Sequence, residues 1–98
     1  MEAEIDHILE SLSENDRSVF GVVVTDESGL CLAIRGDNIP EEAGGLVAAI
    51  ANRSESFLQQ PNADIVYSPV AQIEAEDMVI TVRRIDTVVV GIFKHRHT

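Results

Sequence analysis

The sequence predicts an α+β fold, an α/β sandwich with one helix on each face of a five-stranded, mostly antiparallel sheet. Two segments repeat apolar residues at helical spacing, five are rich in β-branched residues, and short polar turns join most of the strands. The predicted order is α-β-β-α-β-β-β. The 98 residues suit a single domain spanning 1–98.

The first predicted helix lies near the start of the chain. Apolar residues there follow the i, i+3, i+4, i+7 pattern, namely Ile5, Ile8, Leu9 and Leu12. Acidic residues occupy the first turn and the other face, where they suit the helix dipole. This spacing predicts an amphipathic helix of about three turns.

The next two segments predict a hairpin. Residues 19–25, "VFGVVVT", are apolar on both faces, which is typical of a central strand. The turn "DESG" follows, in which Asp26 can accept hydrogen bonds from amides ahead and Gly29 can take a positive φ. Residues 30–35 then return as the second strand.

A second helix is predicted to begin within "GDNIPEE" and to run to about Gln60. Asp37 or Asn38 is the expected cap, and Pro40 suits the first turn. A broad apolar stripe follows, made of Ala43, Leu46, Val47, Ile50, Ala51, Phe57 and Leu58.

The pair Gly44-Gly45 is unusual near the start of a helix, because each glycine costs about 1 kcal/mol relative to alanine. Two explanations stay open. The first turn could be loosely wound. Alternatively, Gly44, Ala48 and Ala51 leave room for another helix or strand to approach closely.

The remaining strands are predicted at 65–67, 70–75, 78–82 and 88–93, with turns near Glu76 and Ile85. Pro69 cannot donate to a sheet ladder, so its strand either begins after the proline or lies at an edge. Residues 88–93 are apolar on both faces, like 19–25. These two strands are therefore expected to form the central pair.

Composition and charge exclude several classes of function. Seventeen acidic against seven basic side chains give a net charge of −10, which disfavours binding to nucleic acid or to an anionic membrane. The acidic first residues do not resemble a signal peptide, and no apolar run approaches the roughly 20 residues that span a bilayer. We therefore expect a cytoplasmic protein, which something else would hold at any membrane where it works.

Candidate catalytic chemistry is sparse, and we predict no catalytic, cofactor-binding or metal-ligating residue. Cys31 is the only cysteine, and the histidines lie near the chain ends, at positions 7, 95 and 97. A thiolate needs a base or a positive field beside it, so a small thiol enzyme using Cys31 is a remote alternative. His95 and His97 are too few for a closed zinc site, and no phosphate-binding glycine motif occurs.

The second helix is the best candidate for a functional surface. A chain of this size buries only about two-thirds of its unfolded surface, and a permanent partner would bury more. The apolar stripe is wider than one sheet face requires, and the strand after Pro69 offers unpaired backbone groups. The predicted partner interface comprises Gly44, Leu46, Val47, Ile50, Ala51, Phe57, Val70 and Ile73.

The sequence also resembles a known family. The first hairpin reads TDxxGLxLxxRG over residues 25–36; an acidic-Ala43-Gly44 helix start follows, and the last strand runs from Asp86 to Lys94. This pattern resembles the roadblock family, and within it the Ragulator subunits, over nearly the whole chain.

The resemblance implies a non-catalytic scaffold that pairs with another roadblock protein through the second helix and an edge strand. Ragulator sits on the cytosolic face of lysosomes and late endosomes, where a lipid-anchored subunit wraps two such heterodimers. It recruits Rag GTPases in amino-acid signalling to the target-of-rapamycin kinase. A cytoplasmic dynein light chain of the same fold is the alternative.

Overall fold

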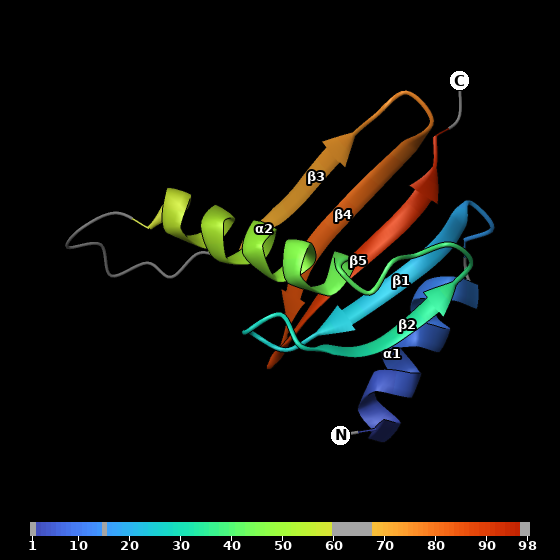
Figure 1. Cartoon of the computed structure of the whole chain (residues 1–98), viewed down its shortest axis with the longest axis horizontal. Helices are drawn as coiled ribbons and strands as arrows, with labels where there is room; N and C mark the ends of the chain where they lie inside the picture. Colours follow the sequence, from blue (N-terminus) through green and yellow to red (C-terminus); the bar gives the residue numbers. More distant parts are fainter. Residues whose placement is uncertain (1, 15, 60–67, 97–98) are drawn as a thin grey trace.

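A five-stranded antiparallel sheet in the order β2-β1-β5-β4-β3 forms the centre of the molecule, with one helix on each face (Figure 1). The computed structural model describes residues 2–14, 16–59 and 68–96. The elements are α1 Glu2–Glu14, β1 Val19–Thr25, β2 Cys31–Gly36, α2 Ala43–Leu58, β3 Val70–Glu74, β4 Met78–Ile85 and β5 Val88–His95. The predicted fold class and element order are confirmed.

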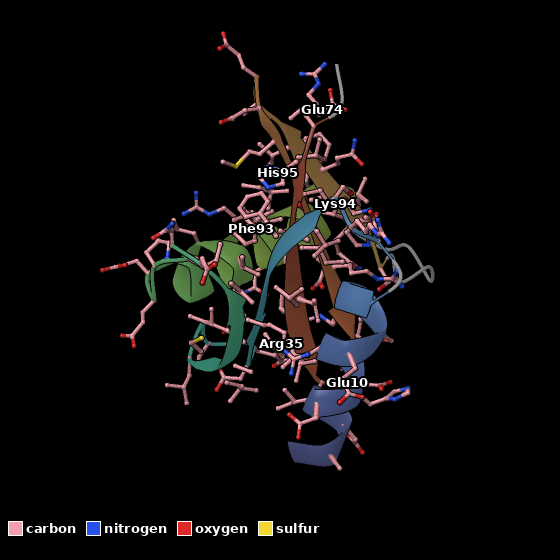
Figure 2. The ribbon with its side chains drawn as sticks, turned by 90° about the vertical axis from the view of Figure 1, so that its right-hand side faces the viewer. Glu10, Arg35, Glu74, Phe93, Lys94 and His95 are labelled. Carbon is pink, nitrogen blue, oxygen red and sulfur yellow. The ribbon has the colours of Figure 1, made fainter. Side chains whose placement is uncertain are left out.

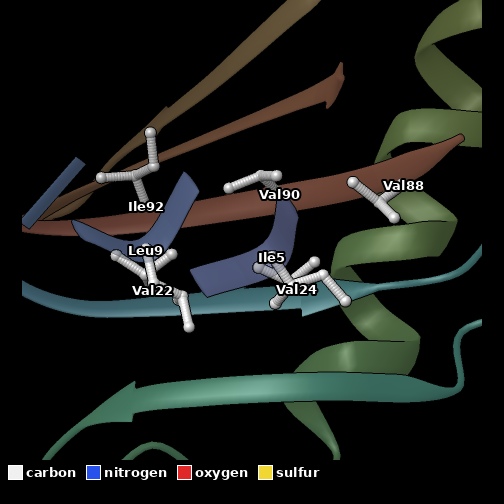
Figure 3. Close-up of a cluster of buried hydrophobic side chains, with 7 residues drawn as sticks. All are labelled: Ile5, Leu9, Val22, Val24, Val88, Val90 and Ile92. Carbon is white, nitrogen blue, oxygen red and sulfur yellow. The ribbon is translucent and has the colours of Figure 1, made fainter. Parts of the chain in front are cut away.

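The sheet is buried on both faces at its centre, where β5 lies between β1 and β4. Successive residues of β5 point to opposite faces of the sheet. Val90 belongs to the buried cluster that includes Ile5 and Leu9 of α1, whereas Val89 belongs to the cluster beneath α2. On the face that α1 covers, Ile5 and Leu9 of the helix pack against sheet residues Val22, Val24, Val88, Val90 and Ile92 (Figure 3). The prediction that residues 19–25 and 88–93 form the central pair is confirmed.

The turn between β1 and β2 is built around one carboxylate. Asp26 Oδ1 accepts hydrogen bonds from the Leu30 amide at 2.9 Å and from the Ser28 amide at 3.0 Å and hydroxyl at 2.8 Å. These donors, the Ser28 hydroxyl first, lower the pKa of Asp26. Gly29 has φ 95°, so the predicted turn chemistry is confirmed.

The predicted cap of the second helix is wrong. The helix begins at Ala43 with Glu42 at the N-cap, and no side chain caps it. Pro40 instead opens a tight turn, in which the Ala43 amide donates to the Pro40 carbonyl at 3.0 Å. Asn38 has a left-handed φ of 62°, which a short polar side chain tolerates. A residue in this conformation is not part of a right-handed helix, so the helix cannot begin there.

Helix α2 ends at Leu58, close to the predicted end near Gln60, a residue that falls outside the described ones. The strand predicted at 65–67 also falls outside the described residues. Pro69 directly precedes β3, which is an edge strand, so both expectations for this proline are met.

An ion pair links the segment after α1 to β5. Asp16 accepts hydrogen bonds from the Ser18 hydroxyl and amide, and Lys94 Nζ lies 3.1 Å from its Oδ2. Chiefly through the Ser18 bonds, the pKa of Asp16 falls from 3.8 to about 2.

This shift predicts a defined acid sensitivity. Because the folded pKa lies below the unfolded one, the ionised Asp16 stabilises the fold fully above about pH 4, and this contribution is lost as the pH falls toward 2. An NMR titration of the Asp16 carboxyl carbon should give a midpoint near 2, rising toward 3.8 in the Ser18→Ala variant. An unchanged midpoint in that variant would contradict the assigned cause.

Candidate protein–protein interface

One flank of α2 carries large apolar side chains that the chain itself leaves uncovered. Leu46 is 64% exposed and Phe57 is 88% exposed. Ile50, four residues after Leu46 and seven before Phe57, lies on the same flank and is half-buried, packed against the buried cluster beneath the helix. Together Leu46, Ile50 and Phe57 form an apolar strip, which we call the α2 strip.

The opposite side of α2 packs on the chain's own sheet. Gly44, Val47 and Ala51, three of the residues predicted for the interface, are buried there with Ala43 and Ala48. Their side chains are therefore not free to contact a partner, and they support the α2 strip from beneath. The apolar stripe predicted for this helix is broad because it combines residues that face the sheet with residues that face outward.

The two glycines of α2 have different roles. A Cβ at Gly44 would lie 3.2 Å from the Cys31 Cβ and 3.3 Å from the Gly29 carbonyl oxygen. The close approach inferred for Gly44 is therefore to the chain's own hairpin. A Cβ at Gly45 would meet nothing within 4 Å, so that glycine is not required for packing inside the chain.

The edge strand β3 lies beside the carboxyl half of α2. In the described part of the chain it is bonded to β4 alone, so its outer backbone groups have no ladder partner there. Ile73 is 43% exposed and opposes Ile80, which places it on the α2 face. Val70 is 56% exposed and opposes Arg83. Arg84 binds α2, so its neighbour Arg83 points to the opposite face, which is the face that α1 covers. The Val70 side chain therefore lies on the α1 face.

A groove of about 370 Å³ separates the end of α2 from the start of β3. Phe57, Leu58, Pro69 and Val70 are among the residues that line it. The α2 strip and the β3 edge are thus parts of one continuous surface.

The sheet beside this surface is only partly covered by α2. The helix crosses the strands near one end, and the far halves of β3, β4 and β5 extend beyond it (Figure 1). Phe93 and His95 lie on the α2 side of β5, whereas Lys94 lies on the α1 side (Figure 2). Phe20 packs edge-on to Phe93 at 6.1 Å between ring centroids and stacks on His95 at 4.4 Å.

Three further residues on this surface, Phe20, Ile80 and Phe93, were not predicted for the interface. All three are half-buried; Ile80 and Phe93 lie on the same face as Ile73, and Phe20 packs against Phe93. The signal that could have found them is the alternation of side chains along each strand, combined with the strand order, which the sequence alone did not provide.

Arg84 fixes α2 against the sheet. Its Nε donates to Glu55 Oε1 at 2.7 Å, one terminal nitrogen donates to Glu27 Oε1 at 2.9 Å, and the other donates to Asn52 Oδ1 at 3.1 Å. The Glu55 carboxylate is the main cause that raises the Arg84 pKa. One guanidinium therefore joins α2, β4 and the β1–β2 turn.

Replacing Arg84 with Ala is expected to lower the free energy of unfolding by about 1–2 kcal/mol, because the half-buried Glu55 loses its charged donor while the exposed Glu27 loses little. Urea denaturation measures this change. Arg83→Ala is the matched control, since Arg83 is exposed and takes part in no ion pair among the described residues. Equal losses for the two variants would contradict the assigned role.

Cys31 lies in a packing environment. It opposes Thr25 at one end of β1, and its Cβ is close to Gly44 of α2. His95 stacks on Phe20 at the other end of β1, roughly 17 Å away along the strand, and His7 lies on α1 at the other face. Neither of these two histidines stands beside the thiol.

Among the described residues, no group of three or more His, Cys, Asp and Glu side chains could hold a metal ion. No helix in the described ranges is long and apolar enough to span a membrane.

Solved structures share this architecture at low sequence identity. The chain is similar to MglB from Myxococcus xanthus, with a TM-score of 0.76 and 16% identity over 97% of this chain and 78% of that one. It is also similar to a Roadblock/LC7 domain from Streptomyces avermitilis, with a TM-score of 0.71 and 13% identity over 90% and 75% of the two chains. At these identities the likeness shows the fold, which is that of roadblock/LC7 proteins.

The family is shown by the sequence itself. Residues 1–94 match the sequence model of Ragulator complex protein LAMTOR5, which covers all seven elements of the fold except the end of β5. The apolar α2 strip, the open β3 edge and the hairpin motif all lie within the matched range. The chain therefore belongs to the LAMTOR5 family of Ragulator complex proteins.

Proposed function

We propose that this chain is a non-catalytic scaffold subunit that forms a heterodimer with another roadblock protein in a Ragulator-like complex. The observation that carries the proposal is the α2 strip lying directly beside an open sheet edge, on a chain of this family. Exposed Leu46 and Phe57 are costly to leave in water and suit a protein partner.

The geometry of pairing follows from these two features. A strand of the partner adds to β3 and satisfies its outer backbone groups, which extends the sheet across both subunits. A helix of the partner then packs on the α2 strip and on the uncovered half of the sheet, over Ile73, Ile80 and Phe93. Val70 contributes chiefly through its backbone, because its side chain lies on the α1 face.

The resemblance stated above supports a more specific role. Within the family, the chain corresponds to the Ragulator subunit also called hepatitis B virus X-interacting protein. It acts at the cytosolic face of lysosomes and late endosomes, held there by a lipid-anchored partner. The complex recruits Rag GTPases for amino-acid signalling to the target-of-rapamycin kinase.

Affinity purification of the native protein, followed by quantification of its stoichiometric companions, tests this proposal. Recovery of a second roadblock subunit and of Rag GTPases is the expected result. Recovery of dynein intermediate chain in their place would support the dynein light chain alternative. A turnover that Cys31→Ser abolishes would contradict the scaffold role itself.

A further inference from the structure

The sheet has a second edge, at β2, on the side opposite β3. In the described part of the chain, β2 is bonded to β1 alone. Three strands separate the two edges, which places them roughly 19 Å apart. A partner strand on β3 would therefore leave β2 accessible.

Residues 31–34 of the β2 edge carry neither charge nor proline, although the register with β1 shifts by one residue at Leu32. Natural edges carry a lysine, a proline or an inward-pointing charge that discourages pairing with another chain. Residues 31–34 read "CLAI", and the first charge along β2 is Arg35. All four of these residues are only half-buried, so α1 and α2 do not close over them.

An open groove of about 510 Å³ runs along this edge. Residues 29–34 form one side of it, and Glu41, in the turn before α2, also lines it. Leu30 stands at the start of the groove with 64% of its surface exposed. Unpaired backbone groups beside such a groove fit an extended chain, because only a strand satisfies donors and acceptors in a row.

The charge around the groove is negative. Residues 26–42 contain five acidic side chains, Asp26, Glu27, Asp37, Glu41 and Glu42, against a single basic one, Arg35. Glu41 is exposed where it lines the groove. An occupant that carries lysine or arginine between apolar residues complements this rim.

We propose that β2 is a second docking edge, which accepts an extended basic and apolar segment of another protein by strand addition. The segment lies along residues 30–35, with an apolar side chain against Leu30 and its positive charges near Glu41 and Asp37. This site is independent of the heterodimer surface and does not require it.

The test uses the full chain and the acetylated, amidated hexapeptide Lys-Val-Lys-Val-Lys-Val, followed by amide chemical shifts in NMR. We expect saturable shifts confined to residues 30–35 and their neighbours in β1. The peptide Lys-Val-Lys-Pro-Lys-Val, with equal charge but a broken ladder, should bind at least tenfold more weakly. Glu-Val-Glu-Val-Glu-Val should do the same, because its charge matches that of the rim.

Two equally exposed leucines provide matched variants. Leu30→Lys removes the apolar contact and adds repulsion, so it should weaken binding of the basic peptide at least tenfold. Leu46→Lys, at the same 64% exposure but on α2, should leave it unchanged. Shifts at β3 alone, no shifts at all, or equal binding of the proline peptide would overturn the proposal. Loss of the heterodimer in Leu46→Asp would not affect it.

Discussion

Replacing Leu46 or Phe57 with Asp is expected to weaken binding to the roadblock partner at least thirtyfold while leaving the chain folded. Both side chains are largely exposed in the single chain, so a charge there meets water in the monomer. In the heterodimer the same charge would be buried without a partner, which costs about 2 kcal/mol or more. Isothermal titration calorimetry of the purified subunits measures the change.

The control for this experiment is Leu30→Asp, which introduces the same charge at a leucine as exposed as Leu46, 64%, next to β2 at the opposite edge of the sheet. We expect it to bind the partner with unchanged affinity. Ile50→Asp should also abolish pairing, but Ile50 packs against the buried cluster beneath α2, so it tests folding and binding together. If Leu46→Asp and Phe57→Asp bind as tightly as the wild type, the α2 strip is not the interface.

Replacing Gly36 with Ala is expected to destabilise the fold by about 3 kcal/mol, because backbone strain and a steric clash add. Gly36 has φ 122°, a conformation that L residues rarely adopt. A Cβ there would collide with the Phe20 carbonyl oxygen and would lie 2.8 Å from the Gly21 Cα. These are backbone atoms of β1, which cannot move without breaking the pairing of β1 with β2.

The matched control is Gly45→Ala on α2. Its Cβ meets nothing within 4 Å, and its φ is not in the left-handed range. The substitution should therefore leave the free energy of unfolding unchanged or raise it by up to about 1 kcal/mol. Urea denaturation compares the two variants. A Gly36→Ala loss below about 1 kcal/mol would show that the end of β2 is less constrained than described.

Much of the fold was predictable because local chemistry and tertiary packing agree in it. Residues 19–25 and 88–93 are apolar on both faces, and they form two adjacent inner strands of the sheet, which suit such residues. The turn at Asp26 and Gly29 is determined by side chains within five residues of one another. Such elements need no knowledge of distant contacts.

The start of α2 was mispredicted because several residues there favour a cap, and only the tertiary path decides among them. Asn38 turns the chain in a left-handed conformation, and Pro40 opens a separate turn. The helix therefore begins at Ala43, several residues after the predicted caps.

The candidate interface could be predicted only in part. The sequence places Leu46, Val47 and Phe57 on one broad apolar stripe. In the structure Val47 is buried against the sheet, whereas Leu46 and Phe57 lie on the exposed flank, and only the position of the sheet relative to the helix decides this. Val70 and Ile73 likewise look alike in sequence, and the register with β4 places them on opposite faces. Arg84 could not be assigned at all, because Glu27 and Glu55 reach it from distant segments.

Native mass spectrometry of the chain, expressed alone and then together with a second Ragulator roadblock subunit, tests the central claim most directly. The account predicts a 1:1 heterodimer as the dominant species on co-expression, reduced to separate chains by Leu46→Asp and retained by Leu30→Asp. A stable monomer that no roadblock subunit converts into a heterodimer would contradict it.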